Sequence, residues 1–391
     1  ESVETILEMA EYKKTGSCHA LIVTGCMAQR YQKEIIEEVP EVDAVLGTTS
    51  YGDIVKALEE AVAGNHFEEF RDIDYLPDTG SKRVLTTGGH FGYLKIAEGC
   101  DKHCTYCIIP KLRGKFRSVP MERLIAQAED MAEQGVKELI LVAQETTVYG
   151  KDLYGKKSLH ILLKKLCEIR GIRWIRILYC YPEEIYDELI ETIRDEKKIC
   201  HYLDIPIQHA SDHILKRMGR RTSKQELIDI VGKLRKEIPD IVLRTTLITG
   251  FPGETEEDHE ELKEFVDEME FDRLGVFTYS PEENTPAAEM ADQVPEEVKE
   301  ERRDELMELQ QEISYDRGQD RIGQELLVMI EGKVADESAY IGRTYGDAPK
   351  VDGYIFVQTG ELLMTGDFAK VRVTGALEYD LIGVLSDEYT E

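Results

Sequence analysis

Residues 93–107 read YLKIAEGCDKHCTYC, a short apolar segment that runs directly into three cysteines. Three residues separate Cys100 from Cys104, and two separate Cys104 from Cys107. Three thiolates so close together can surround one metal centre, but a structural zinc site is closed by four protein ligands. An iron–sulfur cluster held by three cysteines instead leaves one iron open to a substrate or cofactor. The alternative is a zinc loop in which His103 serves as the fourth ligand.

The cysteine loop opens a region, residues 91–285, in which predicted strands alternate with amphipathic helices. The strands are predicted at 93–97, 138–143, 174–179, 202–206, 242–248 and 274–279, and helices between them at 121–134, 183–194, 224–236 and 256–268. Six strand–helix units are fewer than the eight of a closed barrel, so the pattern predicts an α/β fold with a partial, open (β/α)6 barrel. The cysteines follow the C-terminal end of the first strand, where active sites of parallel α/β folds lie.

The sequence on either side of this barrel predicts two further domains and the linkers between them. Residues 1–64 predict a small parallel α/β domain, with helices at 2–12, 29–38 and 51–63 and strands at 20–24 and 44–46. We expect a linker over 65–90, the barrel core over 91–294, a charged helical linker over 295–324 and a small antiparallel β-barrel over 325–391. The chain begins with Glu1 rather than Met, so we expect that upstream residues are missing from it.

The composition narrows the class of protein. The chain has 391 residues, 8 cysteines and a formal net charge of −30 at pH 7. No apolar run is long enough to span a membrane, and no signal peptide is recognisable. Clustered cysteines in a chain of this length fit a reducing cytosol where thiols bind metals, so we expect a cytoplasmic protein. The negative charge repels nucleic-acid phosphates and would attract a basic partner.

The cysteine spacing resembles the signature of radical S-adenosylmethionine enzymes. In that family a three-cysteine 4Fe-4S cluster, implied here at Cys100, Cys104 and Cys107, binds S-adenosylmethionine at its open iron and cleaves it to a 5′-deoxyadenosyl radical. The resemblance implies that Tyr106 packs near the adenine. It also implies that residues near the strand ends bind the cofactor: Gln144, Glu145, Gln208, Arg244, Gly250 and Glu254. Glu145 is a mild departure, because the family usually has Asp or Asn there.

Residues 25–31, GCMAQRY, resemble the GC-x-AQRY element of methylthiotransferases. In that family the N-terminal domain supplies three cysteines to a second 4Fe-4S cluster. The resemblance implies that Cys26 is one of these ligands, and that the other two, absent from this chain, lie in the upstream stretch. Catalytic residues beyond the cluster ligands are unknown from the sequence.

Residues 342–353, GRTYGDAPKVDG, resemble the GR-x-x-x-DAP-x-x-DG element of the protein-modifying subgroup, RimO. That subgroup methylthiolates the β-carbon of an aspartate in small-subunit ribosomal protein twelve, using two S-adenosylmethionine molecules and two clusters. Residues 325–391 resemble the TRAM domain, an OB-like module, and carry 5 Lys and Arg against 13 Asp and Glu, a net charge of −8. RNA binding normally requires cations, although a local basic patch around Arg343, Lys350 and Arg372 stays open.

The resemblance implies a basic ribosomal small-subunit protein as the substrate and an electron donor such as flavodoxin or ferredoxin. It implies no membrane partner, and tRNA is an unfavoured partner. We expect the C-terminal barrel to be a separate substrate-binding module whose removal leaves radical formation largely intact. Two alternatives stay open: a tRNA adenosine 2-methylthiotransferase, and a non-catalytic protein that binds zinc and RNA.

Overall fold

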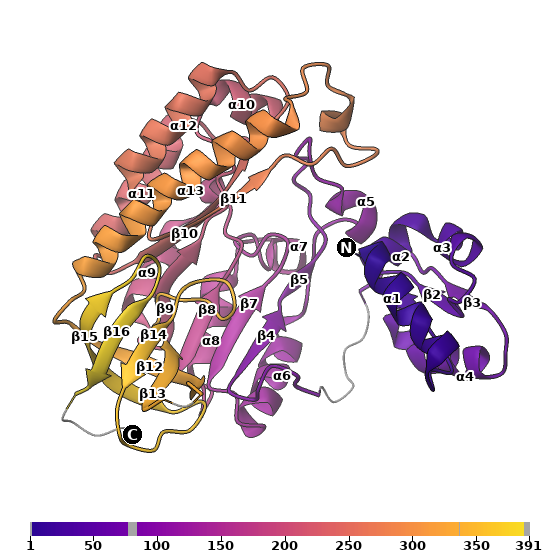
Figure 1. The fold of residues 1–391 in the computed structure, drawn as a ribbon, viewed down its shortest axis with the longest axis horizontal. Coiled ribbons are helices and arrows are strands. Elements are labelled where there is room, and N and C mark those ends of the chain that lie inside the picture. The colour runs from indigo at the N-terminus through magenta and orange to yellow at the C-terminus, as the bar shows by residue number, and fades with distance from the viewer. Residues whose placement is uncertain (1, 77–83, 336, 387–391) are drawn as a thin grey trace. The chain divides into compact units, whose positions relative to one another are not determined.

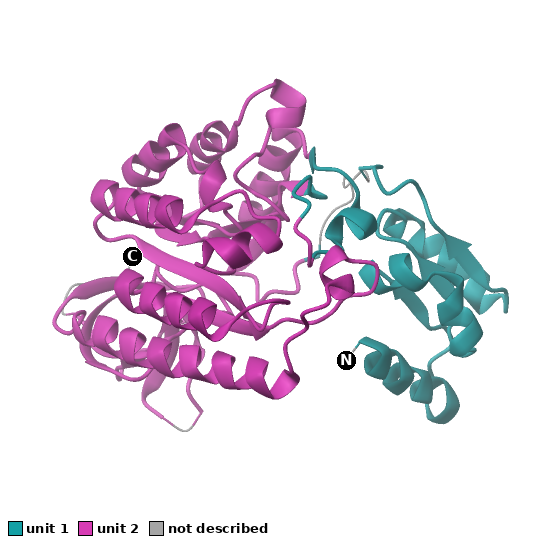
Figure 2. Cartoon of the chain, turned by 90° about the horizontal axis from the view of Figure 1, so that it is seen from above, with its two compact units in different colours: residues 1–84, 98–103, 107–117 teal, residues 85–97, 104–106, 118–391 magenta. Residues whose placement is uncertain are grey.

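The computed structural model describes residues 2–76, 84–335 and 337–386. The chain forms two compact units (Figure 2). Unit 1 contains residues 1–84, 98–103 and 107–117, and unit 2 contains residues 85–97, 104–106 and 118–391. The predicted metal ligands are therefore divided, with Cys26, Cys100 and Cys107 in unit 1 and Cys104 in unit 2.

Unit 1 is built on a three-stranded parallel sheet in the order β1-β2-β3. Its strands are β1 (Ile22–Thr24), β2 (Ala44–Leu46) and β3 (Phe67–Glu69), and its helices are α1 (Ser2–Thr15), α2 (Cys26–Tyr31), α3 (Lys33–Glu38), α4 (Ile54–Val62) and α5 (Ile109–Arg113), with a 3-10 turn at Tyr51–Asp53. The core includes Val23, Ala28, Ile35 and Val45. The sheet is held together by this apolar packing and by its parallel ladders.

Two expectations for unit 1 are wrong in detail. The helix predicted at 29–38 is two helices, because Gln32 has a φ of 45° and interrupts the helical backbone between α2 and α3. The expected linker contains a strand, since Phe67 pairs with Ala44 and adds β3 to the sheet. Residues 77–83 of that linker lie outside the described residues.

Unit 2 contains the predicted open barrel (Figure 1). Six parallel strands follow the order β11-β10-β9-β8-β7-β4. Their bounds are β4 (Phe91–Lys95), β7 (Glu138–Val142), β8 (Trp174–Ile177), β9 (Ile199–Asp204), β10 (Val242–Thr249) and β11 (Arg273–Thr278). Two short strands, β5 (Ala97–Glu98) and β6 (Arg117–Ser118), form a separate pair. The six-stranded sheet confirms the predicted fold class, since each predicted strand overlaps an observed one.

Helices flank this sheet in the way that βα alternation requires. They are α6 (Met121–Glu133), α7 (Lys151–Tyr154), α8 (Leu159–Cys167), α9 (Asp187–Asp195), α10 (Asp212–Arg217), α11 (Lys224–Glu237), α12 (Glu256–Met269) and α13 (Glu296–Gln319), with 3-10 turns at Pro182–Glu184 and Pro286–Glu289. Capping boxes start two of them, Ser223 with Glu226 at α11 and Thr255 with Asp258 at α12. In the described part of the chain, no helix is long and apolar enough to cross a membrane.

Helix α13 occupies the stretch expected to be a helical linker. It packs against β11 and α12 (Figure 1), and it buries Leu306, Gln310 and Ile313. Gln310 donates a hydrogen bond from Nε2 to the Phe271 carbonyl oxygen at 2.8 Å. Residues 296–319 are therefore part of the helical layer that covers the sheet.

The C-terminal region is a closed five-stranded barrel in the order β12-β13-β14-β16-β15. Its strands are β12 (Glu325–Lys333), β13 (Ala339–Arg343), β14 (Ile355–Gln358), β15 (Phe368–Ala376) and β16 (Leu381–Leu385). A core of Val328, Tyr340, Val357 and Val371 fills it. This confirms the predicted small barrel, of which residues 387–391 lie outside the described residues.

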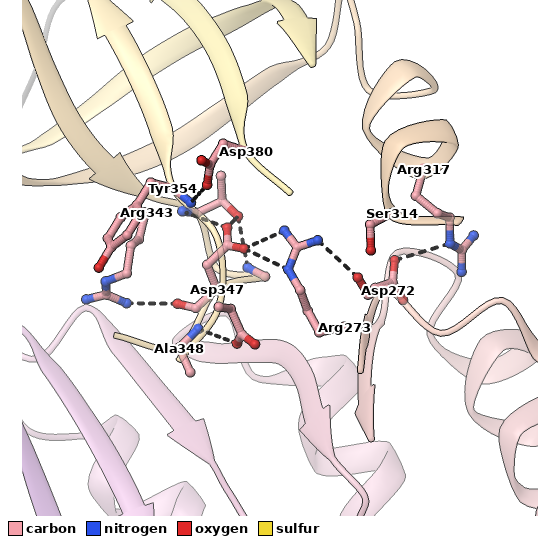
Figure 3. Close-up of polar contacts among 12 residues, drawn as sticks. Asp272, Arg273, Ser314, Arg317, Arg343, Asp347, Ala348, Tyr354 and Asp380 are labelled. Atoms are coloured by element: carbon pink, nitrogen blue, oxygen red, sulfur yellow. Dashed lines mark hydrogen bonds and ion pairs between the residues drawn. The ribbon is translucent and has the colours of Figure 1, made fainter. Parts of the chain in front are cut away.

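Apolar and ionic contacts join this barrel to the six-stranded sheet. Met329 and Phe368 of the barrel belong to one buried cluster with Trp174 and Tyr202 of the sheet. Residues 342–353, which carry the subgroup element, run along the same junction. There Asp347 accepts a hydrogen bond of 2.6 Å from Nη2 of Arg273 (Figure 3).

Arg343 is the centre of the ionic contacts and is fully buried. Its Nη2 donates to Glu138 Oε2 at 2.7 Å, and its Nε donates to Glu331 Oε1 at 2.6 Å. Arg176 donates from Nε to the other oxygen of Glu138 at 2.8 Å. Burial by itself raises the pKa of Glu138, but the two guanidinium groups outweigh it and hold that pKa below its ordinary value.

This arrangement contradicts two expectations. The barrel is not a separate module, because removing it would leave the buried Glu138 without the Arg343 guanidinium and the buried Arg176 without the Tyr345 carbonyl oxygen, which accepts from its Nη1 at 2.6 Å. Arg343 also contributes nothing to a basic surface patch, because its side chain has no exposed surface.

Candidate functional site

Cys104 lies in the loop that follows the first strand of the sheet, and its side chain is buried. Thr105 anchors this part of the loop to the end of α10, because its backbone N–H donates to the Met218 carbonyl oxygen at 2.9 Å and its hydroxyl donates to the Arg217 carbonyl oxygen at 2.9 Å. The Tyr181 hydroxyl lies 3.3 Å from Cys104 Sγ. Burial raises the pKa of Tyr181, so the phenol keeps its proton and can donate a hydrogen bond to the sulfur.

Arg220 stands behind Tyr181. Its guanidinium carbon lies 4.2 Å from the centre of the Tyr181 ring, and its Nη2 donates to the Pro206 carbonyl oxygen at 2.9 Å. The side chain is only 7% exposed, and its Nε and Nη1 have no hydrogen-bond partner among the described residues. A buried guanidinium with unused donors is suited to an anionic group. The donor set at Cys104 therefore fits an anionic iron–sulfur cluster, whose potential depends on hydrogen bonds to sulfur and on nearby charge.

Cys100 and Cys107 are the other two cysteines of the loop. Cys100 is buried and Cys107 is half-buried. The backbone N–H of Cys100 donates to the Gly114 carbonyl oxygen at 3.2 Å, and its Sγ accepts from the backbone N–H of Lys102 at 3.4 Å. Within the described residues, no group of three Cys, His, Asp or Glu side chains stands ready to hold a metal ion. The assignment of Cys100, Cys104 and Cys107 as ligands of one cluster therefore stays a prediction.

Cys26 is the first residue of helix α2, which begins three residues before the start of the helix predicted at 29–38. Arg113, at the end of α5, donates to its Sγ from both Nε and Nη2, each at 3.2 Å. The Nη1 of Arg113 also contacts Glu98 Oε1 at 3.2 Å. Arg113 therefore places a cationic hydrogen-bond donor directly against the Cys26 sulfur. The role of Cys26 as a cluster ligand stays a prediction, with Arg113 as its observed partner.

The residues predicted to bind S-adenosylmethionine lie on or beyond strands β7, β9 and β10, apart from Tyr106, which lies in the cysteine loop. Gln144 and the buried Glu145 follow β7, where Glu145 Oε1 accepts from the Thr147 backbone N–H at 2.9 Å. Gln208 has a φ of 73° and continues the ladder beyond β9, because its N–H donates to the Thr246 carbonyl oxygen at 2.9 Å. Tyr106 packs edge-on against Phe251, with ring centres 6.4 Å apart.

Three others have protein partners of their own. Arg244, on β10, donates from Nη1 to Asp204 Oδ1 at 2.8 Å. Glu254 is buried and accepts from Nη1 of Arg302 at 2.9 Å. A side chain at Gly250, whose φ is 68°, would run into Lys299 of α13. Packing and ion pairing thus explain Gly250 and Glu254 as they stand, and cofactor binding by them stays a prediction.

The sequence reasoning missed Tyr181, Arg220 and the pairing of Arg113 with Cys26. Arg220 and Arg221 directly follow Gly219, and two arginines after a helix end are typical of a solvated surface. Burial of Arg220 depends on β9 and on the loop after β8, which no local pattern reports. Only the position of residues 108–118 next to the cysteines signalled that Arg113 could matter.

Comparisons with known proteins identify the family of the chain. The model of the radical SAM superfamily matches residues 94–266, the TRAM domain model matches residues 322–385, and the model described as uncharacterized protein family UPF0004 matches residues 1–47. The chain is 66% identical over 383 residues to the ribosomal protein uS12 methylthiotransferase RimO of Lachnoclostridium phytofermentans, which covers 98% of this chain and 87% of that protein. It is 51% identical over 390 residues to the protein of the same name from Clostridium botulinum, at 99% and 87% coverage.

A solved structure of the cobalamin-dependent S-adenosylmethionine radical enzyme OxsB aligns with a TM-score of 0.48 and 15% identity, over 73% of this chain and 44% of its own. A likeness this low supports no argument.

The parallel sheet, the cysteine loop beyond its first strand and the match over residues 94–266 define a radical S-adenosylmethionine enzyme. Its cofactors are S-adenosylmethionine and 4Fe-4S clusters, as the cysteine spacing implied. Within that class, the chain belongs to the RimO family of ribosomal protein uS12 methylthiotransferases. The predicted resemblance is confirmed, the tRNA alternative is not favoured, and the non-catalytic alternative is wrong.

In a chain that also carries the two upstream cysteines implied by the resemblance, replacing Cys26 with alanine is expected to lower the iron bound per chain after reconstitution and to stop methylthio transfer, while cleavage of S-adenosylmethionine persists. The reason is that Cys26 and the loop cysteines would serve different clusters. Iron analysis and the yield of 5′-deoxyadenosine check this. Cys18→Ala is the matched control, because Cys18 is half-buried in the same unit and its thiol donates to the Ala20 carbonyl oxygen rather than to a charged partner. Normal methylthio transfer by Cys26→Ala would make that residue merely structural.

Proposed function

We propose that this protein replaces a hydrogen on the β-carbon of an aspartate in ribosomal protein uS12 with a methylthio group. The observation that carries the proposal is the 66% identity, over 98% of the chain, to a protein named for that activity. The element at residues 342–353 supports the same subgroup, since it carries the residues expected there.

Bound S-adenosylmethionine and its cluster would supply the radical chemistry that an unactivated C–H bond requires. The chain's own residues would bind the cluster and hold it in position. Cys100, Cys104 and Cys107 would hold the cluster, Tyr181 would donate a hydrogen bond to Cys104, and Arg220 would place a buried positive charge behind it. Helix α13 and the other helices that flank the sheet hold its strands in place, so that the loops carrying these side chains are fixed relative to one another.

The negative charge of the chain and its need for an electron indicate two kinds of partner, a basic protein substrate and an electron donor. The net charge of −30 would steer a basic ribosomal protein toward the enzyme and would disfavour tRNA. Reduction of the cluster would need an electron donor such as flavodoxin or ferredoxin. A ribosomal protein as substrate and the clustered thiols both suit the cytoplasm.

Binding of uS12 by the reconstituted enzyme is expected to weaken as salt concentration rises, because exposed charges are screened over about 10 Å at 0.1 M salt. Binding of tRNA should be weak at every salt concentration, since the acidic surface offers few cations for phosphates. Titrations of both partners at low and high salt measure this. Tight tRNA binding with no affinity for uS12 would contradict the proposal.

The direct test of activity supplies methyl-labelled S-adenosylmethionine, a reductant and sulfide to the reconstituted enzyme, with uS12 and tRNA in separate reactions. Label should enter uS12 alone. Label in tRNA alone would favour the tRNA-modifying alternative.

A further inference from the structure

Tyr179 combines an exposed side chain with a rare backbone conformation. It follows strand β8, and its φ is 60°, a left-handed value that a residue with a Cβ adopts at a cost. Its neighbours Leu178 and Cys180 are buried, but the Tyr179 side chain is 49% exposed. A bulky residue at such a position is maintained only when its surroundings fix it, and such positions cluster at functional sites.

Side chains from neighbouring strands fix the Tyr179 backbone. Its N–H donates to Asp204 Oδ2 at 3.2 Å. Its carbonyl oxygen accepts from the backbone N–H of Thr146 at 3.1 Å and from the Thr146 hydroxyl at 2.8 Å. Asp204 is itself held by Arg244 at 2.8 Å. Residues on or beyond β7, β9 and β10 therefore hold the Tyr179 backbone in place, while about half of the residue's surface stays exposed.

The position of Tyr179 points to a partner that approaches from solvent. It lies at the C-terminal end of a parallel sheet, where α/β enzymes bind their substrates. Phe277, near the C-terminal end of the edge strand β11, is 61% exposed and pairs in register with Ile248 of β10. Exposed aromatic rings on rigid backbone are the usual anchors of protein interfaces, because they bury much area and lose little conformational entropy.

We propose that Tyr179 contacts the substrate polypeptide and positions the loop of uS12 that carries the target aspartate. The inference rests on the proposed function, since it takes the substrate to be a protein. The observations that support it differ from those that support the proposed function, because they are the backbone conformation of Tyr179 and the exposure of the Tyr179 side chain. Tyr179 acts by binding and orienting the polypeptide.

Tyr179→Gly separates this role from a structural one. Glycine adopts a φ of 60° without strain, so the reconstituted variant should keep the melting temperature and the S-adenosylmethionine affinity of the parent protein. Its affinity for uS12 should fall about tenfold or more, as for an interface anchor. Tyr179→Phe keeps the ring and should retain most of the uS12 affinity. Tyr179→Asn, which also tolerates this conformation, provides a second variant if the glycine variant is unstable.

The matched control is Glu270→Gly, because Glu270 also has a positive φ, 44°, but ends helix α12. That variant should bind uS12 as the parent does. Unchanged affinity of both Tyr179→Gly and Tyr179→Asn for uS12 would overturn the proposal. So would variants that lose affinity for S-adenosylmethionine while they keep their affinity for uS12. If the parent protein does not bind uS12, the proposed function fails as well, whereas equal binding by the parent and the variants rejects the Tyr179 contact alone.

Discussion

Cys104→Ala is expected to abolish the reductive cleavage of S-adenosylmethionine and to lower the iron and acid-labile sulfide bound per chain. The reason is that only three cysteines lie in the loop, so a cluster that loses one has no substitute thiolate at that position. The measurements are the yield of 5′-deoxyadenosine, iron and sulfide analysis, and the electron paramagnetic resonance signal of the reduced cluster.

Cys167→Ala is the control for this variant. Cys167 ends helix α8, and burial raises its pKa to about 11, so its thiol stays protonated and inert at neutral pH. This variant should keep its cluster and its cleavage activity. Undiminished 5′-deoxyadenosine formation by Cys104→Ala would rule out the cluster assignment. One zinc ion per chain without acid-labile sulfide would point to the zinc loop.

Arg343→Ala is expected to destabilise the protein by about 3–5 kcal/mol, because it removes one partner of a buried ion pair and leaves the Glu138 carboxylate undercompensated. The loss should affect the six-stranded sheet as well as the barrel, since Glu138 belongs to β7. Urea unfolding followed by tryptophan fluorescence reports this directly, because the single tryptophan, Trp174, lies in the cluster that joins the two.

Arg372→Ala provides the matched control on the same barrel. Arg372 and Glu325 form an ion pair at 3.4 Å, and their side chains are 56% and 48% exposed. An exposed pair of this kind contributes about 0–1 kcal/mol, so the unfolding midpoint should barely move. Equal midpoints for Arg343→Ala and Arg372→Ala would contradict the account of the barrel as an integral part of the enzyme.

Local patterns predicted the sheet because most residues of each core strand are apolar, aromatic or β-branched. The run at 138–143 and the strand Glu138–Val142 agree to within a residue. Strand β3 has the sequence FEE, which contains one apolar residue and so gives no strand signal. Its strand conformation is stabilised by the backbone hydrogen bonds that pair it with β2. The same limit explains why Gln32 was not recognised as a break, since no proline or glycine marks it.

Contacts between residues that lie far apart in the chain could not be predicted from local sequence patterns. Glu138 begins a predicted strand and looks like a solvated charge, yet it bonds to Arg343, 205 residues away. The element at 342–353 could be recognised as a family resemblance, but its place at the junction of barrel and sheet could not. The cysteine ligands follow from spacing alone, whereas Tyr181 and Arg220 depend on how β8 and β9 end.

The most direct test of the central claim is mass spectrometry of uS12 after incubation with the reconstituted enzyme, S-adenosylmethionine, sulfide and a reductant. Peptide mapping should find one aspartate whose mass has increased by a methylthio group less a hydrogen, and this product should be missing when Cys104→Ala replaces the parent enzyme. Unmodified uS12 after S-adenosylmethionine has been cleaved, together with methylthiolated adenosine in a parallel tRNA reaction, would contradict the account.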